Sequence, residues 1–402
     1  MLLRNAGDGR SITTLVTRID QAIAHAQALR AGDRRAPAHA SGPRRTFAIG
    51  DPQTSTARLF GALDANELLG DDGWLRPDVR LISMGDHFDY YVPERAHGRI
   101  EGVLVLSWLA AHPREQVTLI AGNHDLARVM ELVSIDDVRF QAAGDVARAI
   151  YELPREHREA ADAEFRARYP ELPTTGYAAR DYNAFTVEQR ALVQRLLLAD
   201  RFDLAIAEDD TLFTHAGVTN REVALLDVAP AAGTLAAALA DRFRIAVAAV
   251  AADWHAGIPT PLSLAPLHVA GADGVEGGGL LYHRPADPDR PRGDPAWEFD
   301  PRAPRRFDPR TLPPIRQVVG HTGHSKAWKE MPRWREPAMT GDRGGLRTLA
   351  VTGDRVLYRR GLHDDGDAIV WMIDPEMHYV ASPADVAVLD VTRGRDARQP
   401  RR

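Results

Sequence analysis

The segment Gly122-Asn123-His124-Asp125 places a metal-binding oxygen next to an imidazole, directly after a mostly apolar run. The amide oxygen of Asn123 can bind a cation, and His124 can hold or donate a proton near neutral pH. Residues 117–121 have the pattern of a buried strand, so both side chains are expected at a strand end. The sequence therefore predicts a ligand and an acid side by side, and the other ligands of a metal site must come from elsewhere in the chain.

Four more segments carry oxygen or imidazole ligands where a strand is expected to end. They are Gly50-Asp51-Pro52-Gln53, Gly85-Asp86-His87-Phe88-Asp89, His215-Ala216-Gly217 and Gly320-His321-Thr322-Gly323-His324. In open α/β sheets, ligands bind outside the carboxyl ends of the strands. The chain has no Cys, which excludes thiolate ligands. Carboxylate, amide and imidazole donors are the mixture needed by two divalent cations about 3.5–4 Å apart.

Strands and helices alternate along the first part of the chain, which predicts an α/β sheet built from βαβ units. The expected strands are residues 46–51, 79–84 and 117–121, and the expected helices are residues 55–69 and 94–111. Residues 1–45 are expected to form a separate N-terminal part, with an amphipathic helix at 12–29 and an Ala-, Arg-, Gly- and Pro-rich linker at 30–45.

Residues 46–390 are interpreted as one catalytic domain with two insertions. Residues 130–200, mostly helical and charged, are expected to form a helical cap that leaves the core after His124 and returns before His215. Residues 285–314 contain nine Pro and are expected to be an irregular surface loop. Further strands are expected at 202–207, 211–214, 315–319, 346–351 and 356–358, and a helix at 233–254. Residues 391–402 are expected to be a disordered basic tail.

Composition narrows the classes of function. The 402 residues are 44% hydrophobic, and 50 basic against 56 acidic residues give a net charge of −6. This balance argues against a nucleic-acid partner, which needs basic surface. The most apolar long stretch, residues 235–252, carries Asp241, Arg242 and Arg244, so no membrane partner is expected and the expected location is cytoplasmic. Only two Lys occur, Lys326 and Lys329, and both follow the last ligand motif.

The ordered set of motifs resembles the calcineurin-like metallophosphoesterase superfamily over roughly residues 47–377. Within it, the chain is similar to the phosphoprotein-phosphatase branch and its bacterial relatives. The features that carry this are the Gly85-Asp86…Asp89 spacing, Leu280-Leu281-Tyr282-His283-Arg284, and Ile373-Asp374-Pro375-Glu376-Met377. The resemblance implies an αββα sandwich of two mixed sheets flanked by helices, with the cap inserted. It also implies two divalent metal ions, with Mn favoured and Fe, Zn or Mg as alternatives.

The resemblance also implies a role for each motif residue. Asp86 would bridge both metals, Asp51 would bind the first, and Asn123, His215 and His321 would bind the second. His124 would be the general acid, oriented by Asp89, and Arg284 would hold phosphate oxygens.

The chain departs from the family pattern at two positions. Gln53 stands where the family has a His ligand of the first metal, and His324 is a candidate to compensate for it, although it lies three residues after His321 rather than two. Tyr90 stands where the branch usually has a phosphate-binding Arg. Arg128 or Lys326 is therefore expected to substitute in binding the substrate.

The predicted function is hydrolysis of a phosphomonoester on a protein, a nucleotide or a small molecule, through a hydroxide activated by the two metals. The partner would be the phosphorylated substrate. A phosphodiesterase or nuclease on the same fold is one alternative. A non-catalytic phosphate-binding module, suggested by Gln53 and Tyr90, is another. Greater activity on diesters than on monoesters would favour the phosphodiesterase or nuclease. No activity on either substrate would favour the phosphate-binding module.

Overall fold

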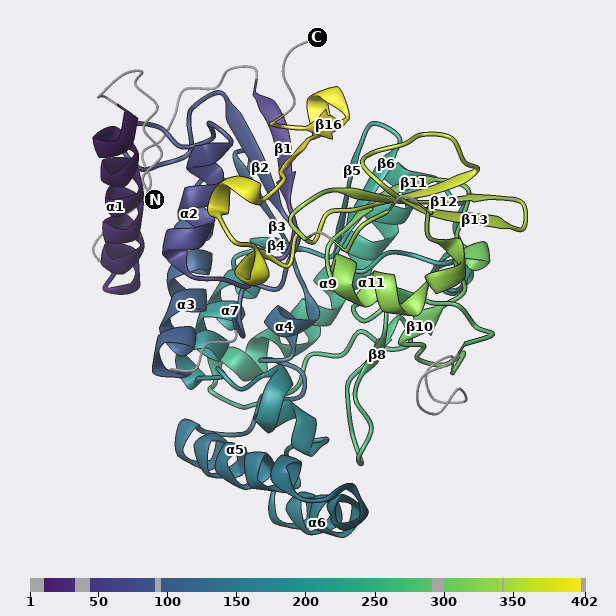
Figure 1. The fold of residues 1–402 in the computed structure, drawn as a ribbon. Helices are drawn as coiled ribbons and strands as arrows, with labels where there is room; N and C mark the ends of the chain where they lie inside the picture. Colours follow the sequence, from purple (N-terminus) through teal and green to yellow (C-terminus); the bar gives the residue numbers. More distant parts are fainter. Residues whose placement is uncertain are drawn as a thin grey trace.

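Two six-stranded mixed sheets pack against each other in the computed structural model, which describes residues 11–32, 44–90, 95–290, 300–337, 339–341 and 343–398. Figure 1 shows the two sheets side by side, with helices on their outer sides. Apolar side chains from both sheets meet between them, among them Ile82, Ile120, Phe213 and Val318. The fold is therefore the predicted αββα sandwich, and its two layers of strands bring distant strand ends together.

The first sheet has the order β16-β15-β1-β2-β3-β4. β1 (Arg45–Ile49), β2 (Val79–Ser83), β3 (Val117–Ile120) and β4 (Phe202–Asp203) are parallel neighbours. β15 (Leu389–Asp390) pairs antiparallel with β1, and β16 (Arg395–Asp396) pairs antiparallel with β15. Because β1, β2 and β3 run parallel, their carboxyl ends lie at one edge.

The second sheet has the order β13-β12-β14-β11-β6-β5. Its central strands β6 (Thr211–Thr214), β11 (Arg316–Val319) and β14 (Ala368–Met372) are parallel, and β5 (Ala205–Glu208), β12 (Arg347–Thr352) and β13 (Arg355–Arg360) add antiparallel pairs. The strand expected at residues 202–207 is in fact two strands. β4 belongs to the first sheet and β5 to the second, so the chain crosses between them at Leu204.

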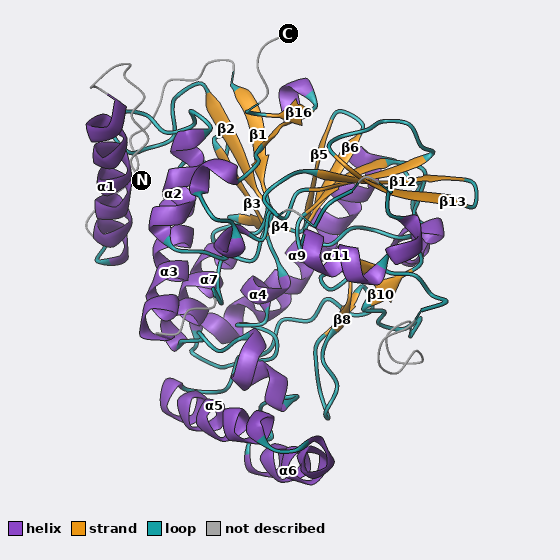
Figure 2. Ribbon diagram, in the orientation of Figure 1, coloured by secondary structure: helices purple, strands orange, loops and turns teal. Residues whose placement is uncertain are grey.

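Helices cover both outer faces of the sandwich (Figure 2). The first sheet carries α2 (Thr56–Ala65) and α3 (Arg95–Ala111), with α1 (Ser11–Arg30) packed against both of them. α7 (Val187–Leu198) packs against α3, and α9 (Ala232–His255) packs against β5 and β6. α11 (His324–Glu330) contributes Ala327 to the apolar cluster that includes Leu349 and Val370 of the second sheet.

The segment between β3 and β4 leaves the sandwich. α5 (Asp137–Glu152) and α6 (Arg155–Arg168) project from it in Figures 1 and 2, and a π-helical turn, η1 (Tyr177–Asp181), follows. These elements have a small apolar core of their own that includes Phe140, Phe165 and Phe185. The later helix α7 instead contributes Leu192 and Val193 to the main core. We call the segment from α5 to Phe185 the cap.

The remaining elements are short. They are α4 (Asn123–Leu126), α8 (Asn220–Leu226), the strand pairs β7 (His268–Val269) with β8 (Gly278–Gly279) and β9 (Arg284–Pro285) with β10 (Arg306–Phe307), and the 3-10 turns η2 to η6. The expectation of a disordered tail is wrong for residues 391–398, because β16 pairs with β15 there. The linker expected at 30–45 lies mostly outside the described residues. Among the helices described, none is long and apolar enough to cross a membrane.

Candidate metal centre

Three of the predicted site residues adopt a left-handed backbone conformation just after their strands. The φ angles are 57° for Asp86, 64° for Asp89 and 58° for His321. Side chains other than Gly enter this region at a cost of about 1–3 kcal/mol each, and such residues concentrate at functional sites. The turns after β2 and β11 therefore hold these three residues in conformations that the local sequence does not favour.

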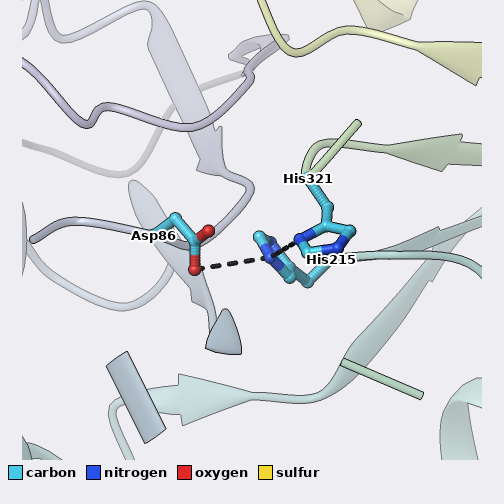
Figure 3. A group of neighbouring side chains, drawn as sticks. All are labelled: Asp86, His215 and His321. Atoms are coloured by element: carbon cyan, nitrogen blue, oxygen red, sulfur yellow. Dashed lines mark hydrogen bonds and ion pairs between the residues drawn. The ribbon is translucent and has the colours of Figure 1, made fainter. Parts of the chain in front are cut away.

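Four side chains from both sheets converge at this edge. Nε2 of His215 lies 3.2 Å from Oδ1 of Asn123, 3.2 Å from Nδ1 of His321 and 3.4 Å from Oδ1 of Asp86. Asp86, His215 and His321 are all buried and form a group that could hold a metal ion (Figure 3). The structure thus brings together Asp86, Asn123, His215 and His321, which the sequence analysis expected around the second metal.

The hydrogen bonds of His215 indicate the charge balance of this group. Its Nδ1 lies 2.7 Å from the carbonyl oxygen of Met84 and donates to it, so a neutral ring presents the lone pair of Nε2 to the other three residues. Those neighbours offer lone pairs as well. Burial opposes protonation of His215, but Asp86 raises its pKa to about 10. The group therefore favours a positive charge between these atoms, which either a proton on His215 or a divalent cation bound by N and O donors would supply.

Asp51 lies on the other side of Asp86. Its two carboxylate oxygens accept from the backbone N–H of His321, each at 2.9 Å. Burial raises the pKa of Asp51 well above its ordinary value, and Asp374 and Asp86 raise it further. Gln53 has a buried Nε2 with no hydrogen-bond partner. A cation near Asp51 would relieve both the crowded carboxylates and the orphaned amide, once that amide turns its oxygen inward.

Two Gly residues let the carboxylates approach the neighbouring loops. A Cβ on Gly122 would lie 2.2 Å from Oδ1 of Asp86, and a Cβ on Gly320 would lie 2.1 Å from Oδ1 of Asp51. Both distances are far below van der Waals contact. No other residue type fits at these positions without moving a predicted ligand.

His124 lies beside the group with its ring oriented by hydrogen bonds. Nδ1 is 2.8 Å from Oδ2 of Asp89, and Nε2 is 3.9 Å from Oδ2 of Asp86. Burial opposes ionisation of Asp89, but Arg128 and His124 outweigh it and lower its pKa. Ionised Asp89 can only accept, so Nδ1 of His124 carries a hydrogen and Nε2 faces the metal group.

Arg128 does not lie where a substrate could reach it. Its guanidinium is completely buried, 2.6 Å from Oδ2 of Asp89 and 3.0 Å from Oε1 of Gln189, and it stacks over the ring of Phe88. The expectation that Arg128 binds substrate is therefore wrong. Its positive charge instead keeps Asp89 ionised beside His124.

His324 is also placed differently from the expectation. Both of its ring nitrogens are already engaged, Nδ1 with the hydroxyl of Tyr358 at 2.6 Å and Nε2 with the carbonyl oxygen of Thr340 at 2.9 Å. It is the first residue of α11, and that helix directs the ring toward β13. The structure therefore does not place His324 among the ligands, and Gln53 gains no imidazole substitute.

Arg284 and Lys326 both lie close to the metal group. They lower the pKa of His321, after the larger effect of burial, and Arg284 is the largest cause of a lowered pKa at Lys326. The Lys326 side chain is exposed to solvent. Its ammonium nevertheless lies near other charged groups, namely Arg284 and the carboxylates of Asp374, Asp51 and Asp86. Two cationic side chains beside a metal group suit an anionic ligand.

The sequence analysis did not assign Asp374, Asp125, Tyr182 or Tyr282 to the site. Asp374 adds negative charge near Asp51. It follows strand β14, and a polar residue after a strand is the same sequence signal that identified Asp86. Asp125 accepts from the backbone N–H groups of Asp86 and Gly122 at 3.0 and 2.9 Å, so it joins two ligand loops. Tyr182 comes from the cap, where no strand end marks it.

Comparisons with known proteins place few constraints on this chain. No family model matches it, and no curated protein matches it. Among solved structures, it is similar to the crystal structure of a cold-active protein-tyrosine phosphatase from a psychrophilic Shewanella species, at 14% sequence identity, over 90% of this chain and 78% of that chain, with a TM-score of 0.38. A likeness at this level carries no argument about activity, so the functional interpretation depends on the geometry of the site.

Proposed function

We propose that this protein is a metal-dependent phosphomonoesterase with His124 as its general acid. The observation that carries the proposal is the orientation of His124. Its Nδ1 is bonded to Asp89, and its Nε2 faces Asp86 in the group that could hold a metal ion. An acid beside a metal group is what cleavage of a phosphoester needs at the leaving oxygen.

The proposed metal ligands are Asp51, Gln53 and Asp86 for the first cation and Asp86, Asn123, His215 and His321 for the second. Two bound cations would polarise the phosphoryl oxygens and lower the pKa of a water molecule. Mn is the favoured metal, because the donors are oxygen and nitrogen and include a neutral amide. The first set is the poorer one, since Gln53 replaces an imidazole.

The chain's own residues divide the remaining work. His124 acts as an imidazolium: its Nε2 donates a proton to the leaving oxygen as the P–O bond breaks, while Asp89 accepts from Nδ1 and stabilises the positive charge of the ring. Arg284, which lies next to His321, contacts the phosphoryl oxygens through its planar fork. Lys326 supplies a second positive charge on the same side. The substrate is a phosphomonoester of a protein, a nucleotide or a small molecule.

The test combines metal analysis with phosphatase assays. Purified protein is loaded with Mn, Fe, Zn or Mg, its metal content is measured, and turnover of an aryl phosphate and of a bis-aryl phosphate is compared. We expect two metals per chain and faster hydrolysis of the monoester. With an alkyl phosphate, whose leaving oxygen must be protonated, His124→Ala should reduce kcat by roughly 100-fold or more without loss of metal. Asp86→Asn should lose metal and activity together.

His255→Ala provides the matched control. His255 is exposed at the end of α9. Its Nδ1 forms a hydrogen bond with the carbonyl oxygen of Ala251, and the residue is not one of the proposed metal ligands. This variant should keep wild-type metal content and kcat. One metal per chain and no turnover with any cation would replace the phosphatase with a phosphate-binding module. Faster turnover of the bis-aryl phosphate would identify a phosphodiesterase instead.

A further inference from the structure

A tyrosine of the cap is packed against the proposed acid. The ring centroid of Tyr182 lies 5.0 Å from that of His124, at an interplanar angle of 57°. Tyr182 is 1% exposed, so its ring fills the space beside the imidazole and water does not. Asp89 holds Nδ1 of His124 by a hydrogen bond. The Tyr182 ring, which belongs to the cap and not to the sandwich, packs against one side of the imidazole.

The same tyrosine also packs against the residue that holds Asp89. The guanidinium carbon of Arg128, which is paired with Asp89, lies 5.8 Å from the centre of the Tyr182 ring. Two residues later, the backbone N–H of Ala184 donates to Oδ1 of Asp89 at 3.3 Å. The segment 182–184 of the cap thus contacts His124, Arg128 and Asp89.

The hydroxyl of Tyr182 extends this contact to the metal side of the site. It forms a hydrogen bond with the hydroxyl of Tyr282. The ring of Tyr282 lies 6.1 Å from that of His321 and stacks on His268 at 5.5 Å. Tyr282 precedes Arg284 by two residues. One cap residue therefore connects the proposed acid to the segment that carries the proposed phosphate ligand.

We propose that Tyr182 is a positioning residue that holds the His124 imidazole at the angle required for proton donation. The inference rests on the proposed function of this site. Without the ring, the imidazole keeps its bond to Asp89 but can turn about it, and water can enter beside it. Small displacements of a catalytic group lower kcat strongly, because proton donation needs a near-linear approach to the leaving oxygen. The cap is then part of the catalytic apparatus and does more than control access.

The test compares two substrates in two variants of Tyr182. An alkyl phosphate needs its leaving oxygen protonated, whereas an activated aryl phosphate such as p-nitrophenyl phosphate leaves without a proton. Tyr182→Leu should lower kcat for the alkyl phosphate by about tenfold or more, a part of the 10²–10⁴ that a general acid contributes. It should change kcat for the aryl phosphate by less than about twofold, and metal content should not change. Tyr182→Phe retains the ring and should restore the wild-type ratio between the two substrates.

Tyr177→Phe is the matched control. Tyr177 lies in the same buried cluster, 4.8 Å from the Tyr182 ring, but its hydroxyl bonds Glu131 and the N–H of Gly277. It should leave the ratio between the substrates unchanged. If Tyr182→Leu does not fold, Tyr182→Met fills more of the space without supplying a ring. Equal losses on both substrates, or none, in a folded and metal-loaded variant would overturn the inference. A wild-type protein that binds metal without hydrolysing either substrate would instead remove the proposed function, and this inference with it.

Discussion

Replacing Arg128 with Met should destabilise the protein without weakening its affinity for phosphate. The guanidinium and the Asp89 carboxylate are both completely buried and lie 2.6 Å apart. Met fills a similar volume with no charge. The variant therefore leaves an ionised carboxylate in the core with hydrogen bonds from the His124 imidazole and the Ala184 N–H but without its counter-ion, which is strongly unfavourable.

The expected loss of stability is about 3–5 kcal/mol, the range for removing one partner of a buried ion pair. Urea denaturation, followed by circular dichroism, gives the difference in unfolding free energy. The comparison requires that the unfolding free energy of both proteins has the same dependence on urea concentration. The double variant Arg128→Met, Asp89→Asn removes both charges and should recover about 2 kcal/mol relative to the sum of the single changes. The exposed pair of Arg76 and Asp78, with side chains 44% and 47% exposed, provides the control. Arg76→Met should cost less than about 1 kcal/mol.

Inhibition of the metal-loaded enzyme by inorganic phosphate distinguishes the two roles of Arg128. We expect the inhibition constant of the variant to match that of the wild type, because the guanidinium does not face the substrate. The reasoning is refuted if Arg128→Met costs under about 1 kcal/mol, or if the inhibition constant rises while stability is unchanged. Either result would return Arg128 to a substrate-binding role.

Three further changes test other parts of the structure. Gly122→Ala should displace Asp86, whose Oδ1 would lie 2.2 Å from the new Cβ, and should lower kcat about 100-fold with reduced metal content measured by atomic emission. Gln53→His should tighten binding of the weaker metal about tenfold, or ~1.4 kcal/mol, in calorimetric titrations; unchanged affinity would place Gln53 outside the site. Burial raises the pKa of Glu131 from 4.5 to about 7. Its folded form holds a proton more tightly, so unfolding free energy should fall by roughly 3 kcal/mol as pH rises through this window and then level off, and Glu131→Gln should flatten that profile in urea titrations at several pH values.

Much of the sandwich follows from local patterns. β1, β2 and β3 appear as short apolar runs, and each ends in a polar residue that the parallel arrangement brings to one edge. β14 obeys the same rule, since Asp374 follows it closely, although the sequence analysis named no strand there. The division of residues 202–208 between two sheets has no such local signal, because an apolar run looks alike in either sheet.

The errors at the site have a common physical cause. Sequence spacing gives the type of a side chain but not the direction in which tertiary packing turns it. In the sequence, Arg128 has the appearance of a cation available to a substrate. In the structure its guanidinium pairs with Asp89 and donates to Gln189. His324 stands close to His321 in the chain, but it begins a helix that turns its ring to Tyr358. Tyr182 reaches the site from a cap whose position relative to the sandwich is set by contacts over long separations.

The antiparallel pairing of β15 with β1 also affects how the chain is made. The ion pair that joins Arg45 to Asp390 spans 345 residues, and β15 is the neighbour of β1 on that side among the strands described. At about 5–20 residues per second, synthesis leaves this edge of β1 open for roughly 20–70 s. An open edge strand is a template for pairing with other chains. The nascent protein therefore has an exposed edge prone to aggregation until residues 389–396 emerge. Loss of β15 and β16 should reduce the yield of folded protein even though neither strand contributes to the metal site.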